Sequence, residues 1–156
     1  MKKITALLLS LMCIFNTGCP KTEQWCTKYN QYYKYVSTYV IPSINVLMHT
    51  VDFPKKEYYG TLISTVELVN EKIYIACQNP GSLNNDQRTE LGMAVAKSLE
   101  AMYILAQEYK KAGQVTIGED SEATRKLTSK DLSELESIVN GMNLLKHDII
   151  SEIFKE

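Results

Sequence analysis

The stretch KKEYYGTLISTVELVNEKIYIACQ, residues 55–78, decides the fold, because its apolar side chains recur every three or four residues. This spacing places them on one face of an α-helix. The helix must end at Asn79-Pro80-Gly81-Ser82, since proline cannot continue a helix and glycine favours a turn. The apolar face consists of Tyr59, Leu62, Val66, Val69, Ile73 and Ala76.

The preceding residues, 23–51, carry a second apolar stripe with the same period. Pro42 interrupts this stripe, and a proline inside a helix removes a hydrogen bond and pushes on the preceding turn. We therefore expect a kink or a split near residues 39–43, and a turn at residues 51–54 before the next helix. The stripe consists of Cys26, Tyr29, Tyr33, Val36, Val40, Ile44, Leu47 and Val51.

Two further amphipathic helices are expected in the second half of the chain. One begins at residues 84–86, whose short polar side chains are good caps, and ends at Ala112-Gly113. Its stripe consists of Leu91, Val95, Ser98, Met102, Leu105 and Tyr109. The other begins at residues 128–131 with the spacing of a capping box. Its stripe consists of Leu135, Ile138, Met142, Leu145 and Ile149, flanked by Leu132, Val139 and Ile153.

Four amphipathic helices predict an all-α fold, an antiparallel four-helix bundle with up-down-up-down topology. The first two connections are short. The third, residues 113–127, is long and polar, so we expect it to be either mobile or functional.

Residues 1–19, MKKITALLLSLMCIFNTGC, have the pattern of an export signal. Lys2 and Lys3 form a basic start, and an apolar run of the expected length follows at residues 4–15. This run is too short to span a membrane, although an ordinary cleaved signal and a retained anchor are the alternatives. Asn16-Thr17-Gly18-Cys19 then resembles the lipobox of bacterial lipoproteins, with Asn16 where that family usually has Leu.

The resemblance implies that signal peptidase II removes residues 1–18 and that Cys19 receives acyl chains such as palmitate. Residues 19–22 would then be a short tether and residues 23–156 the bundle domain. The protein is expected in the bacterial cell envelope, anchored in the membrane and facing the periplasm. Pro20 follows the cysteine, where Asp retains lipoproteins of enteric type at the inner membrane, so the outer membrane is favoured over the inner.

Cleavage would remove Cys13 and acylation would consume Cys19, which leaves Cys26 and Cys77 as the two free cysteines. They are equidistant from the turn at residues 51–52. In an antiparallel helical hairpin such residues lie side by side. An exported protein favours a disulfide between them, with two buried free cysteines as the alternative. The cysteine positions therefore test the hairpin independently of its apolar period.

Tyrosine is the one compositional anomaly, with ten in the chain, five of them at residues 29–39. At helical spacing Tyr32, Tyr35 and Tyr39 point progressively away from the apolar stripe. Tyrosine is enriched at interfaces, so these three are the candidate partner-binding residues, with Tyr58 extending the surface. The alternative is edge packing, with the hydroxyls in water.

The chain carries 17 basic and 18 acidic side chains without a concentrated basic face, so no nucleic-acid partner is expected. No metal, haem-attachment, redox or serine-nucleophile motif occurs, and we expect no cofactor and no catalytic residues. Haem held between His147 and Met142 or Met102 is an alternative. The leading hypothesis is an envelope lipoprotein acting by protein–protein interaction, as an adaptor, an exclusion or immunity factor, or an accessory factor. A structural, self-associating lipoprotein is the second, and an enzyme or haem carrier the third.

Overall fold

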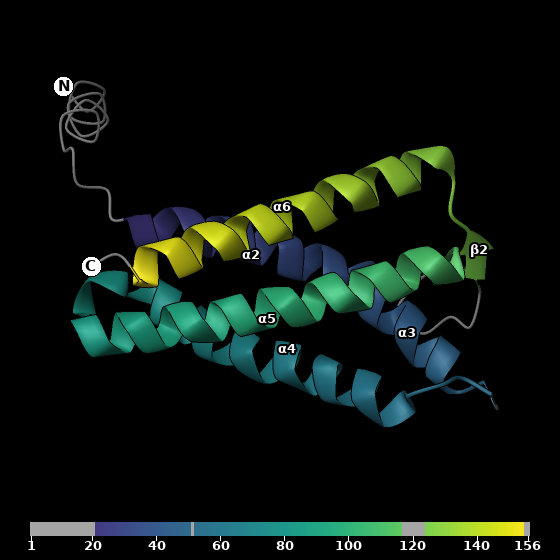
Figure 1. Ribbon diagram of the computed structural model, residues 1–156, viewed down its shortest axis with the longest axis horizontal. Coiled ribbons are helices and arrows are strands. Elements are labelled where there is room, and N and C mark those ends of the chain that lie inside the picture. The colour runs from purple at the N-terminus through teal and green to yellow at the C-terminus, as the bar shows by residue number, and fades with distance from the viewer. Residues whose placement is uncertain (1–20, 51, 117–123, 155–156) are drawn as a thin grey trace, which may run out of the picture.

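The computed structural model describes residues 21–50, 52–116 and 124–154. Within them, four long helical segments pack antiparallel in up-down-up-down order (Figure 1). The first segment combines α2 (Lys21–Tyr35), the π-helical η1 (Val36–Val40) and α3 (Ile41–Met48). The others are α4 (Lys56–Gln78), α5 (Asn85–Ala112) and α6 (Ser129–Ile153), with the short 3₁₀ helix η2 (Pro80–Ser82) before α5. The predicted four-helix bundle is confirmed.

The first segment changes its winding just before Pro42, where the sequence predicts a kink or a split. In η1 the backbone N–H of Ile41 donates to the carbonyl of Val36, five residues earlier. This wider turn accommodates a proline that has no N–H and whose ring would crowd the carbonyl four residues before it. The segment therefore continues through the proline instead of splitting into two separate helices.

The predicted helix ends of α5 and α6 are confirmed in detail. The Asn84 side chain accepts from the backbone N–H of Gln87, whose side chain accepts from the Asn84 N–H in return. Thr128 and Asp131 form the same reciprocal capping box at the start of α6. Gly113 ends α5 with φ of 66°, in the left-handed region that glycine adopts without strain.

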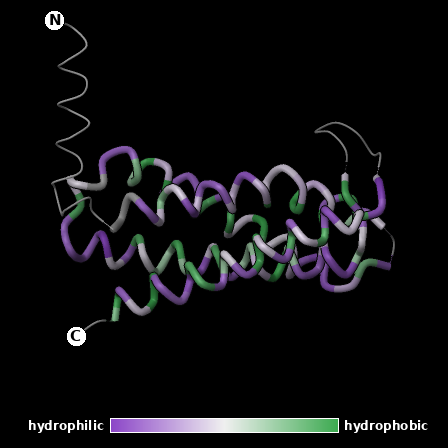
Figure 2. The backbone as a smooth tube through the Cα atoms, turned by 90° about the horizontal axis from the view of Figure 1, so that it is seen from above, coloured by the Kyte–Doolittle hydropathy of each residue, from purple (hydrophilic) through white to green (hydrophobic). Residues whose placement is uncertain are grey.

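The core runs along the bundle axis, with α5 packed most extensively on α4 and α6 (Figure 1). Apolar segments recur between polar segments along the helical turns, as expected for amphipathic helices in a bundle (Figure 2). All six residues of the α5 stripe are buried. In α6, Val139 takes the buried place expected for Ile138, which is only partly buried. The hydroxyl of Tyr29 pairs with Ser98 Oγ at 2.8 Å, so this buried polar group is satisfied.

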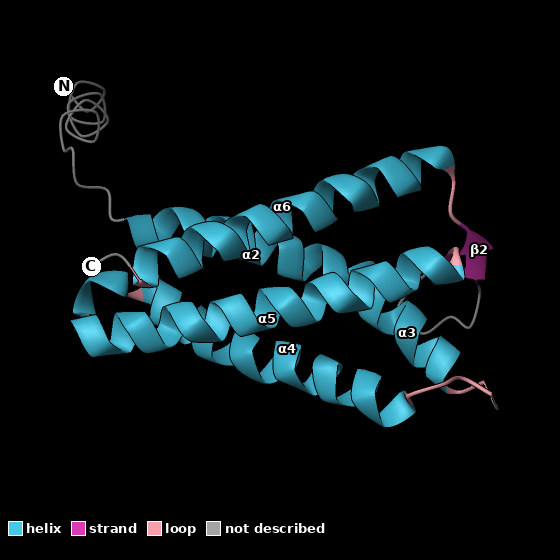
Figure 3. Ribbon diagram, in the orientation of Figure 1, coloured by secondary structure: helices cyan, strands magenta, loops and turns pink. Residues whose placement is uncertain are grey.

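The long connection contains a small β-hairpin that the helical period does not predict (Figure 3). Strands β1 (Gln114–Thr116) and β2 (Thr124–Lys126) pair antiparallel, with Val115 opposite Arg125. Val115 and Thr116 are buried, and Ser43 Oγ accepts from the Thr116 N–H at 2.9 Å. Contacts with α3 therefore give this part of the connection a defined structure. Residues 117–123 lie outside the described residues.

Candidate functional site

The residue expected to carry the lipid, Cys19, lies outside the described residues, as does the signal segment 1–18. The predicted cysteine pair is confirmed, since Cys26 and Cys77 form a disulfide with their Cα atoms 6.1 Å apart. Cys26 lies near the start of α2 and Cys77 near the end of α4, so the bond joins the two helices at the end of the bundle where α2 begins (Figure 1).

The three tyrosines expected on the partner surface differ in their surroundings. Tyr39 is 43% exposed, whereas Tyr32 and Tyr35 are only partly exposed and pack against the core. Tyr32 lies over Gly141 of α6. Tyr35 and Tyr39 contact each other, with ring centroids 5.2 Å apart. Tyr58, which was expected to extend the surface, packs its ring edge-on against Tyr59 in α4.

Tyr35 and Tyr39 belong to a group of side chains that we call the tyrosine–arginine cluster. The cluster gathers where the first helical segment, the end of α5, strand β2 and the start of α6 meet. Together with Val115, its members line a cavity of about 70 Å³. They are Tyr35, Tyr39, Tyr109, Arg125, Asp131 and Glu134.

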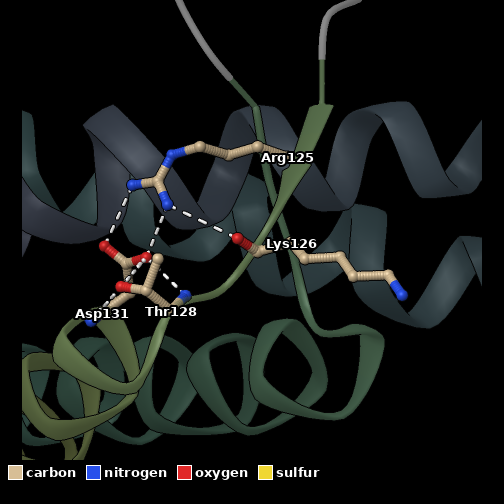
Figure 4. Close-up of polar contacts among 4 residues, drawn as sticks. All are labelled: Arg125, Lys126, Thr128 and Asp131. Atoms are coloured by element: carbon tan, nitrogen blue, oxygen red, sulfur yellow. Dashed lines mark hydrogen bonds and ion pairs between the residues drawn. The ribbon is translucent and has the colours of Figure 1, made fainter.

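Arg125 is fixed in the cluster by a two-pronged ion pair with Asp131 (Figure 4). Its Nη1 lies 2.6 Å from Asp131 Oδ2, and its Nη2 lies 3.0 Å from Oδ1. The backbone N–H and the hydroxyl of Thr128 each donate to the same Oδ2, both at 2.7 Å. The Lys126 side chain points away from this network, whereas its backbone carbonyl accepts from Arg125 Nη1 at 3.4 Å (Figure 4). The capping carboxylate of α6 thus holds β2 and its arginine in one orientation.

The surroundings of the cluster favour an ionised carboxylate at Asp131 and neutral phenols at Tyr35 and Tyr109. The hydrogen bond from Arg125, followed by those from Thr128, lowers the pKa of the Asp131 carboxyl. Burial, reinforced by the carboxylates of Glu134 and Asp131, raises the pKa of Tyr35 to about 12. Burial likewise raises the pKa of Tyr109. At neutral pH the two phenols are therefore protonated donors beside an ionised arginine–aspartate pair.

The cluster is suited to contact with another macromolecule more than to enclosing a ligand. Its cavity of about 70 Å³ is well below the volume of ordinary small-molecule pockets, roughly 300–1,000 Å³. Tyr39 and Arg125 reach the surface, and the side chain of Arg125 is 43% exposed in the ion pair. Tyrosine and arginine are among the residues that most often dominate binding energy at protein interfaces.

Sequence reasoning identified Tyr35 and Tyr39 but missed Arg125 and Glu134 as their neighbours. Tyr109 was expected as a core residue, and it is indeed 1% exposed. The capping box predicted Asp131 at the start of a helix, but nothing in the sequence predicted that Arg125 would bind the same carboxylate. That contact depends on the β-hairpin, which tertiary packing creates.

The alternative haem pair is not assembled, because His147 is exposed whereas Met102 and Met142 are fully buried in the core. Among the described residues, no cluster of three or more His, Cys, Asp or Glu side chains is arranged to hold a metal ion. None of the helices in the described part is both long and apolar enough to cross a bilayer. Two open depressions, of about 300 and 220 Å³, flank Trp25 at the other end of the bundle.

Comparison of the chain with protein-family models, curated proteins and solved structures gave no match.

Proposed function

We propose that this protein is a lipid-anchored protein of a bacterial cell envelope that acts by binding another protein through the tyrosine–arginine cluster. The observation that carries the binding function is that exposed Tyr39 and Arg125 line the same cavity, where Asp131 holds the Arg125 guanidinium in place. Side chains ordered before binding lose less conformational entropy when a partner arrives, which favours affinity.

The anchoring rests on the lipobox-like sequence that ends at Cys19. The Cys26–Cys77 disulfide supports export, because disulfides persist in oxidising compartments such as the periplasm. The cluster lies at the end of the bundle opposite the start of α2 (Figure 1). A protein anchored through Cys19 would therefore present the cluster away from its own membrane, toward proteins of the periplasm or the facing membrane.

Site-specific photo-crosslinking in the exporting host tests the binding function. A photoreactive phenylalanine replaces Tyr39 in one variant and Tyr58 in the matched control, which is a tyrosine of similar exposure, 46% against 43%. We expect position 39, but not position 58, to give a discrete heterologous adduct. Arg125→Ala should reduce that adduct, since it removes the second exposed contact.

Self-association is the second candidate, because the bundle also exposes Leu68 and Ile75 on one face of α4, two turns apart. The same experiment separates the two candidates by mass. A crosslinked species with twice the mass of the protein would favour self-association. No adduct at position 39 in folded, exported protein would contradict the proposed contact.

A further inference from the structure

The end of the bundle that holds the disulfide also gathers exposed apolar side chains. The start of α2, the end of α4, the start of α5 and the end of α6 all lie there (Figure 1). Of the nine large hydrophobic side chains exposed in the described residues, four lie within about one turn of these helix ends. They are Tyr74, Ile75, Ile150 and Phe154. At the opposite end the described residues expose two large hydrophobic side chains, Tyr58 near the start of α4 and Tyr39 in the tyrosine–arginine cluster.

Chain length restricts what this end can face if Cys19 is lipidated. Helix α2 begins at Lys21, two residues after Cys19. Two fully extended residues span at most about 7 Å. Trp25 lies four residues into the helix, a rise of about 6 Å. The acyl chains would therefore hold Trp25 close to the membrane surface.

Trp25 has surroundings that suit the boundary between lipid and water. The partly buried Trp25 lines both open depressions, the first together with Lys28 and the second together with Arg88. Asp148 in the first depression and Glu152 in both make the surface mixed in charge. Tryptophan with lysine or arginine is typical of the headgroup level of a bilayer, and carboxylates disfavour deeper insertion into hydrocarbon.

We propose that this end, around Trp25, Ile150 and Phe154, rests on the phospholipid headgroups of the membrane that holds the lipid anchor. The inference rests on the proposed lipidation of Cys19 and adds a second, direct contact with the bilayer. The disulfide-linked end of the bundle then faces the membrane. The tyrosine–arginine cluster lies at the other end of α5, which has 28 residues. At the rise of an α-helix this separation is about 40 Å.

Trp25 is the only tryptophan in the chain, so its fluorescence reports on this end alone. Acylated protein from the exporting host would be reconstituted into phosphatidylethanolamine–phosphatidylglycerol vesicles, with and without lipids brominated near the headgroup end of the acyl chain. We expect brominated lipid to reduce the Trp25 emission. In the control, Trp25→Phe with Tyr58→Trp, the reporter moves to the opposite end, and we expect no loss of emission.

Two surface variants test the apolar contact itself. Phe154→Ser should weaken the quenching of Trp25, whereas Leu144→Ser should leave it unchanged, although the two side chains are similarly exposed, 71% and 67%. Circular dichroism would verify that each variant is folded.

The outcomes separate this inference from the proposed anchoring. Acylated, folded protein whose Trp25 is not quenched would overturn the headgroup contact and leave the anchor intact. Protein without an acyl group, detected by mass spectrometry, would overturn both. A further series lowers the protein-to-lipid ratio at a constant fraction of brominated lipid. Quenching that disappears at low protein density would indicate that a second copy brings Trp25 to the lipid, and would also overturn the proposal.

Discussion

The ring of Tyr32 in α2 fills the place that a side chain at position 141 of α6 would need. A Cβ atom built on Gly141 would lie 2.8 Å from the Cζ of Tyr32 and closer still to its hydroxyl. Glycine at this position therefore allows α2 and α6 to approach with the tyrosine between them, even though glycine weakens a helix interior.

Gly141→Ala should consequently destabilise the protein by about 1 kcal/mol, because the crowding cost of roughly 1–3 kcal/mol exceeds the gain in helix propensity. In the background Tyr32→Ala, the same substitution should stabilise by roughly 0.5–1 kcal/mol, since the space is then free. Urea unfolding of the four proteins in this cycle measures both values. The same sign in both backgrounds would show that Tyr32 does not occupy the site.

Loss of the disulfide should destabilise the bundle strongly. Cys26 and Cys77 are 51 residues apart in sequence. Closing a loop of that length stabilises by about 4 kcal/mol in the chain-entropy model. Cys26→Ser with Cys77→Ser should therefore lower the urea midpoint, and reduction of the wild-type protein should have a similar effect. Peptide mapping without reductant should recover the linked pair, and two freely alkylated thiols in native protein would contradict the pairing.

Acid should weaken the cap of α6 through Asp131. Hydrogen bonds from Arg125 and Thr128 lower the pKa of its carboxyl in the folded state, so the stabilisation is present above the unfolded value, about 4. It is lost as the pH falls below that value. Asp131→Asn should thus be less stable than wild type at pH 7, and the difference should shrink in acid. Asp148→Asn, an exposed carboxylate of the same helix, serves as the control. A difference that does not depend on pH would contradict the assigned ion pair.

Alkali should act on the buried phenol of Tyr29. Burial raises its pKa to about 12, from about 10 in the unfolded chain. The folded state therefore favours the neutral phenol, and this stabilisation is full below pH 10 and is lost as the pH rises toward 12. Tyr29→Phe should be less stable than wild type at neutral pH by about 1 kcal/mol, because Ser98 loses its hydrogen-bond partner. The deficit should shrink above pH 10 in denaturant titrations, and a constant deficit would contradict the raised pKa.

The features predictable from the sequence are those set by local chemistry. Asn84 and Thr128 mark helix starts because each side chain accepts from the backbone N–H three residues later, and the side chain at that later position accepts from the backbone N–H of Asn84 or Thr128 in return. Gly113 marks an end because its positive φ suits glycine. The cysteine pair indicates the register of the first hairpin because a disulfide forms only between neighbouring positions.

The features missed depend on contacts between distant segments. Strands of three residues are too short to show a period of two, and β1 is ordered by Ser43, 73 residues away from Thr116. Pro42 predicts a distortion, but not its form, which is a π-helical turn with Val36 and Val40 buried in the core. The tyrosine–arginine cluster could not be predicted from the sequence for the same reason. Arg125 and Tyr35 are distant in sequence, and the β-hairpin brings them to the same cavity.

Acyl labelling tests the central claim, that this bundle is anchored through a lipid on Cys19. Cells expressing wild-type protein, Cys19→Ser or the matched control Cys13→Ser would be labelled with a palmitate analogue, and the protein isolated and weighed by mass spectrometry. The account predicts label on the wild type and on Cys13→Ser, with mature masses that begin at Cys19, and no label on Cys19→Ser. Undiminished label on Cys19→Ser, or none on the wild type, would contradict it.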